Sequence, residues 1–367
     1  MNATTRLHEL GQSLWLDNIT RDLLSSGTLK RYCTDFSVTG LTSNPTIFDE
    51  AIRNSTAYDE ALHRKDKEGQ NGEQLFFKLA LEDLTEAAAL FRPVHEATGG
   101  IDGWVSLEVS PLLANDAGAT VEAAKRLHKQ ARCSNLFIKI PGTRAGVEAI
   151  EESIFAGVPV NVTLLFSCEQ YIAAADAYCR GIQRRINARL DPKIASVASI
   201  FVSRWDKAVM DKVSPALRNR LGIAISGQVY KAYRERLAST GWRKLADAGA
   251  LSQRLLWAST GTKDPQLPQS YYIEALAAPA TINTVPEKTL HAFSKEGVLR
   301  GIMREDGGDS ETVLAGFAKA GVDIQALAAQ LQLEGAQSFT KSWNDLMAVI
   351  ASKSEQLHRS RGSALGS

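Results

Sequence analysis

Eight short apolar runs, most of them followed by a longer segment of helical periodicity, constrain the fold of this 367-residue chain more than any other feature. The predicted strands cover residues 13–19, 36–43, 104–110, 136–141, 159–166, 196–202, 254–260 and 281–286. Strict alternation of strand and helix favours parallel pairing, and eight such units favour closure of the sheet into a barrel. We therefore predict an α/β fold, a single (β/α)8 TIM barrel that occupies residues 1–367 as one domain.

Three segments lie outside this alternation. A polar stretch over residues 56–74 is interpreted as an insertion, and residues 298–358 are predicted to form additional C-terminal helices that pack on the barrel. Residues 359–367 are expected to be a flexible tail. The packing prediction rests on one apolar helix face, which carries Phe339, Trp343, Leu346, Met347 and Ile350.

Charge and composition exclude several classes of partner. The chain has 42 Lys plus Arg against 41 Asp plus Glu, so no global field attracts nucleic acid or an anionic membrane. No run of about 18 apolar residues occurs, so we expect no membrane span. The first residues lack the apolar run of a signal peptide, and we expect a cytoplasmic protein.

Cysteine and histidine spacing gives no indication of a metal. The four cysteines form no CxxC pair, and the six histidines are dispersed along the chain. Thiolate and imidazole sites need ligands at convergent spacing. No Gly-rich phosphate loop follows any predicted strand, which also weakens a nucleotide-binding alternative. We therefore expect no metal and no cofactor.

Polar residues interrupt nearly every predicted strand at or near its carboxyl end, where barrel enzymes place their chemistry. These residues are Asp17, Ser43, Asn44, Glu108, Lys139, Asn161, Thr163, Ser199, Ser203, Arg204, Ser259 and Thr260. One such residue means little, but seven strands that converge on one end form a candidate site.

Lys139 is the most informative of them. It alternates with Leu136, Ile138 and Ile140, so its side chain points to the opposite face of the strand, and a closed barrel buries both faces. Removing an amine from water favours its uncharged, nucleophilic form. Glu108, on the neighbouring predicted strand, has two interpretations: the partner in a structural ion pair, or a proton shuttle for a reactive lysine.

The other polar residues also have two interpretations each. Asp17 is either a helix N-cap or a second acid–base group, and Asn44, which precedes Pro45, could be only an N-cap. Asn161 and Thr163 point to the same side of a buried strand and require partners, which favours a ligand or ordered water. Arg204 is either a phosphate clamp or a solvated arginine at a helix start.

Six stretches give the chain a resemblance to a known family. They are LTSNPTIF, SLEVSP, FIKIPGT, VNVTLLFS, SIFVSRWD and WAST, and they follow one another in this order between residues 41 and 260. The chain resembles the transaldolase family, in particular a longer branch related to fusions with a sugar-phosphate isomerase.

The resemblance implies a class I aldolase mechanism in the pentose phosphate pathway without a cofactor. Lys139 would form the Schiff base, Glu108 and Thr163 would order a catalytic water, and Asp17 would act in carbon–carbon cleavage. The residues implied in substrate binding are Asn44, Asn161 and Ser199 for the dihydroxyacetone hydroxyls, and Arg204 and Ser259 for phosphate. The substrates would be sedoheptulose 7-phosphate and glyceraldehyde 3-phosphate.

Three positions refine the resemblance. Fructose 6-phosphate aldolases have glutamine and tyrosine where this chain has Glu108 and Phe201, so transfer is favoured over simple cleavage. Transaldolases carry a second phosphate-binding arginine two residues after the seventh-strand serine, and here that position is Gly261. Lys263 is the candidate substitute, as a point charge without the planar fork of arginine.

Two alternatives remain open at this stage. One is an aldolase that releases free dihydroxyacetone, and the other is a non-catalytic barrel that only binds sugar phosphates. A metal-dependent aldolase would need a histidine cluster that the sequence lacks. We expect sugar phosphates as ligands and a monomer or a homodimer.

Overall fold

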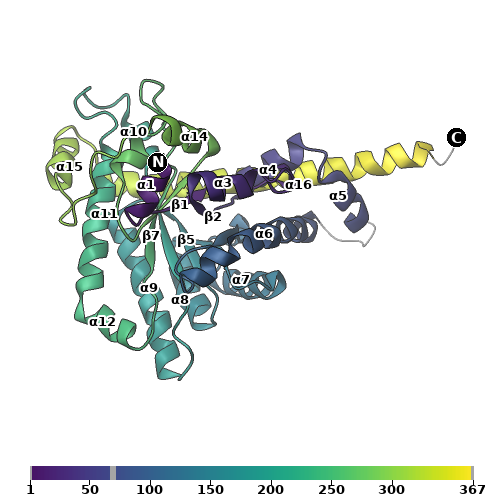
Figure 1. Cartoon of the computed structure of the whole chain (residues 1–367), viewed down its shortest axis with the longest axis horizontal. Coiled ribbons are helices and arrows are strands. Elements are labelled where there is room, and N and C mark those ends of the chain that lie inside the picture. Colours follow the sequence, from purple (N-terminus) through teal and green to yellow (C-terminus); the bar gives the residue numbers. More distant parts are fainter. Residues whose placement is uncertain (1, 67–71, 365–367) are drawn as a thin grey trace.

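The computed structural model describes residues 2–66 and 72–364 and confirms the predicted barrel (Figure 1). Each of the eight strands lies within the run predicted for it, shortened by a few residues at most. The strands are β1 (Ser13–Leu16), β2 (Val38–Leu41), β3 (Val105–Glu108), β4 (Leu136–Pro141), β5 (Val160–Leu165), β6 (Ser196–Phe201), β7 (Arg254–Ala258) and β8 (Ile282–Val285).

All strand pairs are parallel, in the order β2-β1-β8-β7-β6-β5-β4-β3. The two outer strands of this order, β2 and β3, approach each other, and the Leu41 N–H donates to the Trp104 carbonyl at 3.0 Å. The sheet therefore curls into a nearly closed barrel, and all eight carboxyl ends lie at one mouth.

Helices surround the strands. They are α1 (Ala3–Glu9), α2 (Arg21–Ser25), α3 (Thr28–Phe36), α4 (Pro45–Asn54), α5 (Asp59–Asp66), α6 (Gly72–Ala97), the 3-10 turn η1 (Pro111–Leu113), α7 (Ala117–Ala131), α8 (Arg144–Phe155), α9 (Cys168–Asn187), α10 (Ser203–Val209), α11 (Leu221–Ala238), α12 (Thr240–Asp247), α13 (Tyr271–Ala275), α14 (Glu287–Glu296), α15 (Ser310–Lys319) and α16 (Ile324–Ala364).

The helix that directly follows β6 is short. α10 ends at Val209, and α11 starts at Leu221 because the buried carboxylate of Asp206 accepts the backbone N–H groups of Leu221 and Gly222. These donors are the unpaired groups at the start of a helix, so Asp206 caps α11 from another helix.

The additional C-terminal helices are α15 and α16. The apolar face of α16 is buried, with Trp343 packed edge-on against Phe76 of α6 at 5.2 Å between ring centres. Figure 1 shows α16 (yellow) running past the barrel and projecting beyond it toward the C-terminus. A tail was expected from residue 359, but the backbone remains helical to Ala364, and residues 365–367 lie outside the described part.

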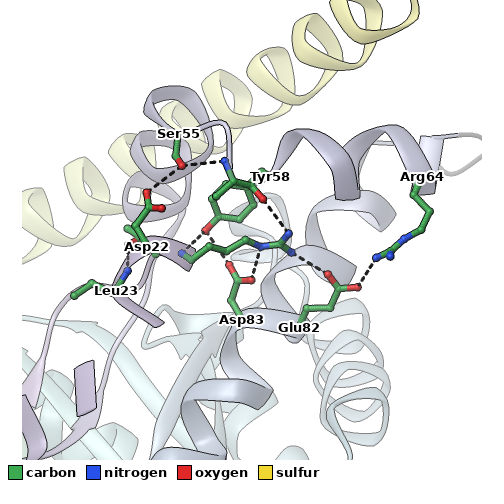
Figure 2. Close-up of polar contacts among 10 residues, drawn as sticks. Asp22, Leu23, Ser55, Tyr58, Arg64, Glu82 and Asp83 are labelled. Atoms are coloured by element: carbon green, nitrogen blue, oxygen red, sulfur yellow. Dashed lines mark hydrogen bonds and ion pairs between the residues drawn. The ribbon is translucent and has the colours of Figure 1, made fainter. Parts of the chain in front are cut away.

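The 56–74 insertion contains α5, and its residues 67–71 lie outside the described part of the chain. Its first turn is anchored by Tyr58, which is fully buried and donates to the Asp83 carboxylate of α6 at 2.8 Å (Figure 2). Arg21 of α2 donates to the other Asp83 oxygen at 2.9 Å and covers the Tyr58 ring. The insertion is therefore tied to the segment that follows β1.

No single described helix is both long and apolar enough to cross a bilayer. Only α15 together with α16 up to Gln356, a bent pair, meets that criterion, by length and composition.

Candidate active site

A cavity of about 140 Å³ opens among the carboxyl ends of the strands. Nine of the eleven predicted site residues line it: Asp17, Asn44, Lys139, Thr163, Ser199, Phe201, Arg204, Ser259 and Lys263. The other two, Glu108 and Asn161, contact members of this group directly. The barrel therefore brings all of the predicted residues together at one mouth.

Lys139 lies at the centre of this group. On β4 it is in register with Glu108 of β3 on one side and Asn161 of β5 on the other. Its Nζ lies 3.1 Å from Glu108 Oε2 and donates to the Ser43 carbonyl at 2.9 Å. Both charged side chains are about 5% exposed. Lys139 therefore forms the ion pair with Glu108 and also lines the cavity at the mouth of the barrel.

The two carboxyl groups near Lys139 are strongly desolvated. Burial raises the pKa of Glu108 above its usual range, and the neighbouring Lys139 opposes this effect. Burial likewise raises the pKa of Asp17, against the charge of Lys139 and a hydrogen bond from Thr42. A carboxyl group with a raised pKa takes up and returns a proton more readily near neutral pH.

The N-cap alternative is wrong for Asp17 and correct for Asn44. The N-cap of α2 is Thr20, and the Asp17 carboxylate instead accepts the Thr42 hydroxyl at 2.7 Å. Asn44 caps α4 by accepting the Ile47 N–H at 3.1 Å, and it also lines the cavity. Its capping bond fixes the side chain that faces the cavity.

A second polar chain holds the neutral side chains of β5 and β6. The Ser199 hydroxyl donates to Asn161 Oδ1 at 2.7 Å, and Asn161 Nδ2 donates to Ser106 Oγ at 3.1 Å. Thr163 is different, because its buried hydroxyl has no hydrogen-bond partner among the described residues. That hydroxyl is available to a ligand or to water, as the strand pattern predicted.

Two cationic side chains, Arg204 and Lys263, also line the cavity. Burial lowers the pKa of Arg204, whose guanidinium lies over the Phe201 ring at 5.0 Å. Partial burial of its ammonium, with the charges of Arg204 and Lys207, lowers the pKa of Lys263. Cations that repel one another beside a cavity favour an anionic group between them. Ser259, whose hydroxyl lies 3.1 Å from that of Ser203, lines the same cavity.

Other residues in or beside the site were not predicted. Thr42, Thr284 and Ser106 hydrogen-bond to predicted residues or to one another, and two of them lie within stretches that carry the resemblance. Gln332 and Phe339 come from α16. The sequence pattern of α16 predicted only that its apolar face packs on the barrel. It did not predict that residues of this helix lie beside the cavity.

No group of three or more His, Cys, Asp or Glu side chains suited to a metal ion occurs in the described part of the chain.

Comparison with known proteins gives the family. The sequence model of the transaldolase/fructose-6-phosphate aldolase family matches residues 14–350. The transaldolase of Frankia alni is 42% identical over 368 aligned residues, which cover 98% of each chain. The transaldolase of Acidothermus cellulolyticus is 40% identical over 97% of this chain and 98% of its own, and that of Thiobacillus denitrificans is 41% identical over 95% and 100%. The chain belongs to the transaldolase/fructose-6-phosphate aldolase family.

Proposed function

We propose that this protein is a transaldolase of the non-oxidative pentose phosphate pathway. It transfers a dihydroxyacetone unit from sedoheptulose 7-phosphate to glyceraldehyde 3-phosphate, and the products are erythrose 4-phosphate and fructose 6-phosphate. The observation that carries the proposal is Lys139, a buried amine with a carboxyl group 3.1 Å away, which lines the same cavity as the cations Arg204 and Lys263.

Schiff-base formation is the first step. The Lys139 amine attacks the C2 carbonyl carbon of the ketose, and the resulting carbinolamine loses its oxygen as water to give an iminium ion. The amine must give up a proton before attack, and the proposed acceptor is Glu108. Glu108 returns that proton through a water molecule, and Thr163 orders this water with its free hydroxyl.

Carbon–carbon cleavage follows. Asp17 takes the proton from the C4 hydroxyl, the C3–C4 bond breaks, and the aldehyde leaves while the electron pair moves into the iminium group to form an enamine. The raised pKa of Asp17 strengthens it as a base for this step. The enamine carbon then attacks the acceptor aldehyde, whose oxygen takes the proton back from Asp17, and hydrolysis frees the new ketose.

The remaining residues would bind the two ends of the sugar. Asn44, Asn161 and Ser199 are proposed to hold the dihydroxyacetone hydroxyls close to Lys139. The phosphate is proposed to lie between Arg204 and Lys263, with a hydrogen bond from Ser259. The support is the position of these side chains around one cavity.

Two features favour transfer over release of free dihydroxyacetone. Glu108 and Phe201 occupy the positions at which fructose 6-phosphate aldolases have glutamine and tyrosine. The apolar Phe201 ring beneath Arg204 offers no hydroxyl to protonate the enamine carbon. We place the enzyme in the cytoplasm, as a monomer or a homodimer that needs no cofactor.

The test is a product assay with two arms. The first contains sedoheptulose 7-phosphate and glyceraldehyde 3-phosphate, and mass spectrometry follows fructose 6-phosphate and erythrose 4-phosphate. The second contains fructose 6-phosphate alone and follows free dihydroxyacetone. Lys139→Met should abolish the first reaction, and Lys125→Met, at an exposed site on α7, should not change it.

The outcomes separate the three functions. Product in the first arm with little dihydroxyacetone in the second supports the transaldolase. Comparable dihydroxyacetone release without an acceptor identifies an aldolase. Saturable sugar-phosphate binding without product in either arm identifies a binding barrel, and both of these results overturn the proposal.

A further inference from the structure

Gln332 of α16 connects two strand ends at the mouth of the barrel. Its Nε2 donates to the carbonyl of Gly142, directly after β4, and to the carbonyl of Leu164 near the end of β5, both at 2.9 Å. A primary amide has two N–H donors on Nε2, so these two bonds use both. No other residue of α16 hydrogen-bonds to both of these strand ends in the described part of the chain.

The two strand ends carry the reacting groups of the proposed mechanism. β4 holds Lys139, and β5 holds Thr163, one residue before Leu164. The Gly142 N–H also donates to the Thr163 carbonyl at 2.7 Å. The peptide groups on both sides of Leu164 are therefore held from β4 and α16.

This stretch of β5 needs such support because its backbone is unusual. Leu164 has φ of 58°, in the left-handed region that a residue with a Cβ adopts at an energetic cost. The pairing of β5 with β6 shifts between Val162 and Leu165, so the bonds of a regular strand are interrupted here. A strained residue persists only where surrounding contacts determine its conformation.

Thr163 depends on that backbone for its orientation. Its hydroxyl has no partner of its own among the described residues, so no side-chain hydrogen bond fixes it before substrate or water binds. α16 is itself held closely at this point, because a Cβ added to Gly335 would lie only 2.9 Å from Leu164 Cδ2. The helix backbone therefore lies directly against the strained residue.

We infer that Gln332 is a positioning residue for Thr163 in the Schiff-base steps. The inference rests on the proposed function, since it concerns the efficiency of the same site. Gln332 touches no reacting atom; it fixes the Leu164 carbonyl and so the direction of the hydroxyl that orders the water. Loss of this contact should slow imine formation and hydrolysis but leave sugar-phosphate binding, which depends on Arg204 and Lys263, nearly unchanged.

The experiment compares Gln332→Met with Gln330→Met. Gln330 is an exposed glutamine of the same helix whose amide donates only to Glu334. We expect Gln332→Met to lower kcat and the rate of borohydride-trapped adduct formation at least tenfold, with KM for the ketose within twofold. Gln330→Met should match the wild type. Equal kinetics for the two variants would overturn the inference, as would a tenfold rise in KM with unchanged kcat.

A double-mutant comparison tests the route through Thr163. In a Thr163→Val background, Gln332→Met should cost less than twofold in kcat, because the hydroxyl that it orients is gone. If the double variant instead lost kcat by the product of the two single-variant factors, Gln332 would act independently of Thr163. The inference would then fail.

A second variant covers the case in which Gln332→Met does not fold. Gln332→Glu has nearly the same shape, and its protonated form regains one donor for the carbonyls. Its kcat relative to wild type should therefore rise as the pH falls from 8 to 5, and a flat ratio would count against the inference. Absence of turnover by the wild type would instead refute the proposed function, so the two failures are distinguishable.

Discussion

Removal of the Lys263 charge should weaken the enzyme selectively toward phosphorylated substrates. Lys263 and Arg204 line the cavity, and their mutual repulsion contributes to the lowered pKa of Lys263. A hydrogen bond to a charged group contributes about 1.5–3 kcal/mol, which corresponds to about 10- to 150-fold in kcat/KM. Because Lys263 is only partly buried, its contribution should lie at the lower end, at about tenfold.

The assay compares erythrose 4-phosphate with erythrose as acceptors for the dihydroxyacetone unit. Lys263→Met keeps the aliphatic stem and should lower kcat/KM about tenfold for the phosphorylated acceptor, with little change for erythrose. Lys207→Met is the control, because Lys207 acts on Lys263 through its charge but does not line the cavity. Its effect should be smaller and should disappear in high salt.

In the Lys263→Met variant, an arginine introduced at Gly261 should restore kcat/KM for erythrose 4-phosphate. A Cβ added at Gly261 would lie 3.5 Å from its nearest neighbour, Pro286 Cγ, so a side chain fits there. The planar fork of arginine binds phosphate through two hydrogen bonds. Equal losses for erythrose 4-phosphate and erythrose in Lys263→Met would refute the assignment of Lys263 to the phosphate.

Three further predictions concern other parts of the molecule. Glu108→Gln should lower kcat by about 10²- to 10⁴-fold, the usual contribution of a general acid–base group. Its effect on ketose binding, measured by calorimetry, should be much smaller. An unchanged kcat would show that Glu108 has no part in the mechanism. Burial raises the pKa of Asp206 from 3.8 to about 6, so the folded protein binds more protons than the unfolded chain between these values. The contribution of Asp206 to the free energy of unfolding should therefore fall by about 2 kcal/mol as the pH rises from 4 to 7, and Asp206→Asn should lack this component in denaturant titrations. Gly335→Val should raise KM for phosphorylated ketoses and also lower kcat, because a Cβ at Gly335 would lie 3.3 Å from Nη1 of Arg204 and 2.9 Å from Leu164 Cδ2. Gly241→Ala, where a Cβ meets nothing within 4 Å, should leave both unchanged.

The barrel and most of the site could be predicted because both depend on local pattern. The strands are short apolar runs between helical segments. Closure of a parallel barrel brings their carboxyl ends to one mouth, independently of the loop conformations. Residues such as Asp17 and Lys139 could therefore be assigned to one site from the sequence alone. The pairing of Lys139 with Glu108 followed from the adjacency of their strands, and the structure adds that the pair faces the cavity.

The contributions of α16 could not be predicted, because they depend on contacts between residues distant in sequence. Gln332 bonds to carbonyls more than 160 positions earlier in the chain. Amide side chains on a helix surface carry no pattern that indicates such a partner. The start of α11 at Leu221 could not be predicted for a similar reason, since the buried carboxylate of Asp206 that caps it comes from another helix.

Covalent trapping tests the central claim most directly. Fructose 6-phosphate is incubated with the enzyme in the presence of borohydride, and the protein is then digested and its peptides are mapped by mass spectrometry. The account predicts one reduced sugar adduct, on the peptide that contains Lys139, and its loss in Lys139→Met. An adduct on a different lysine, or none while transfer proceeds at the normal rate, would contradict the assignment of this amine as the nucleophile.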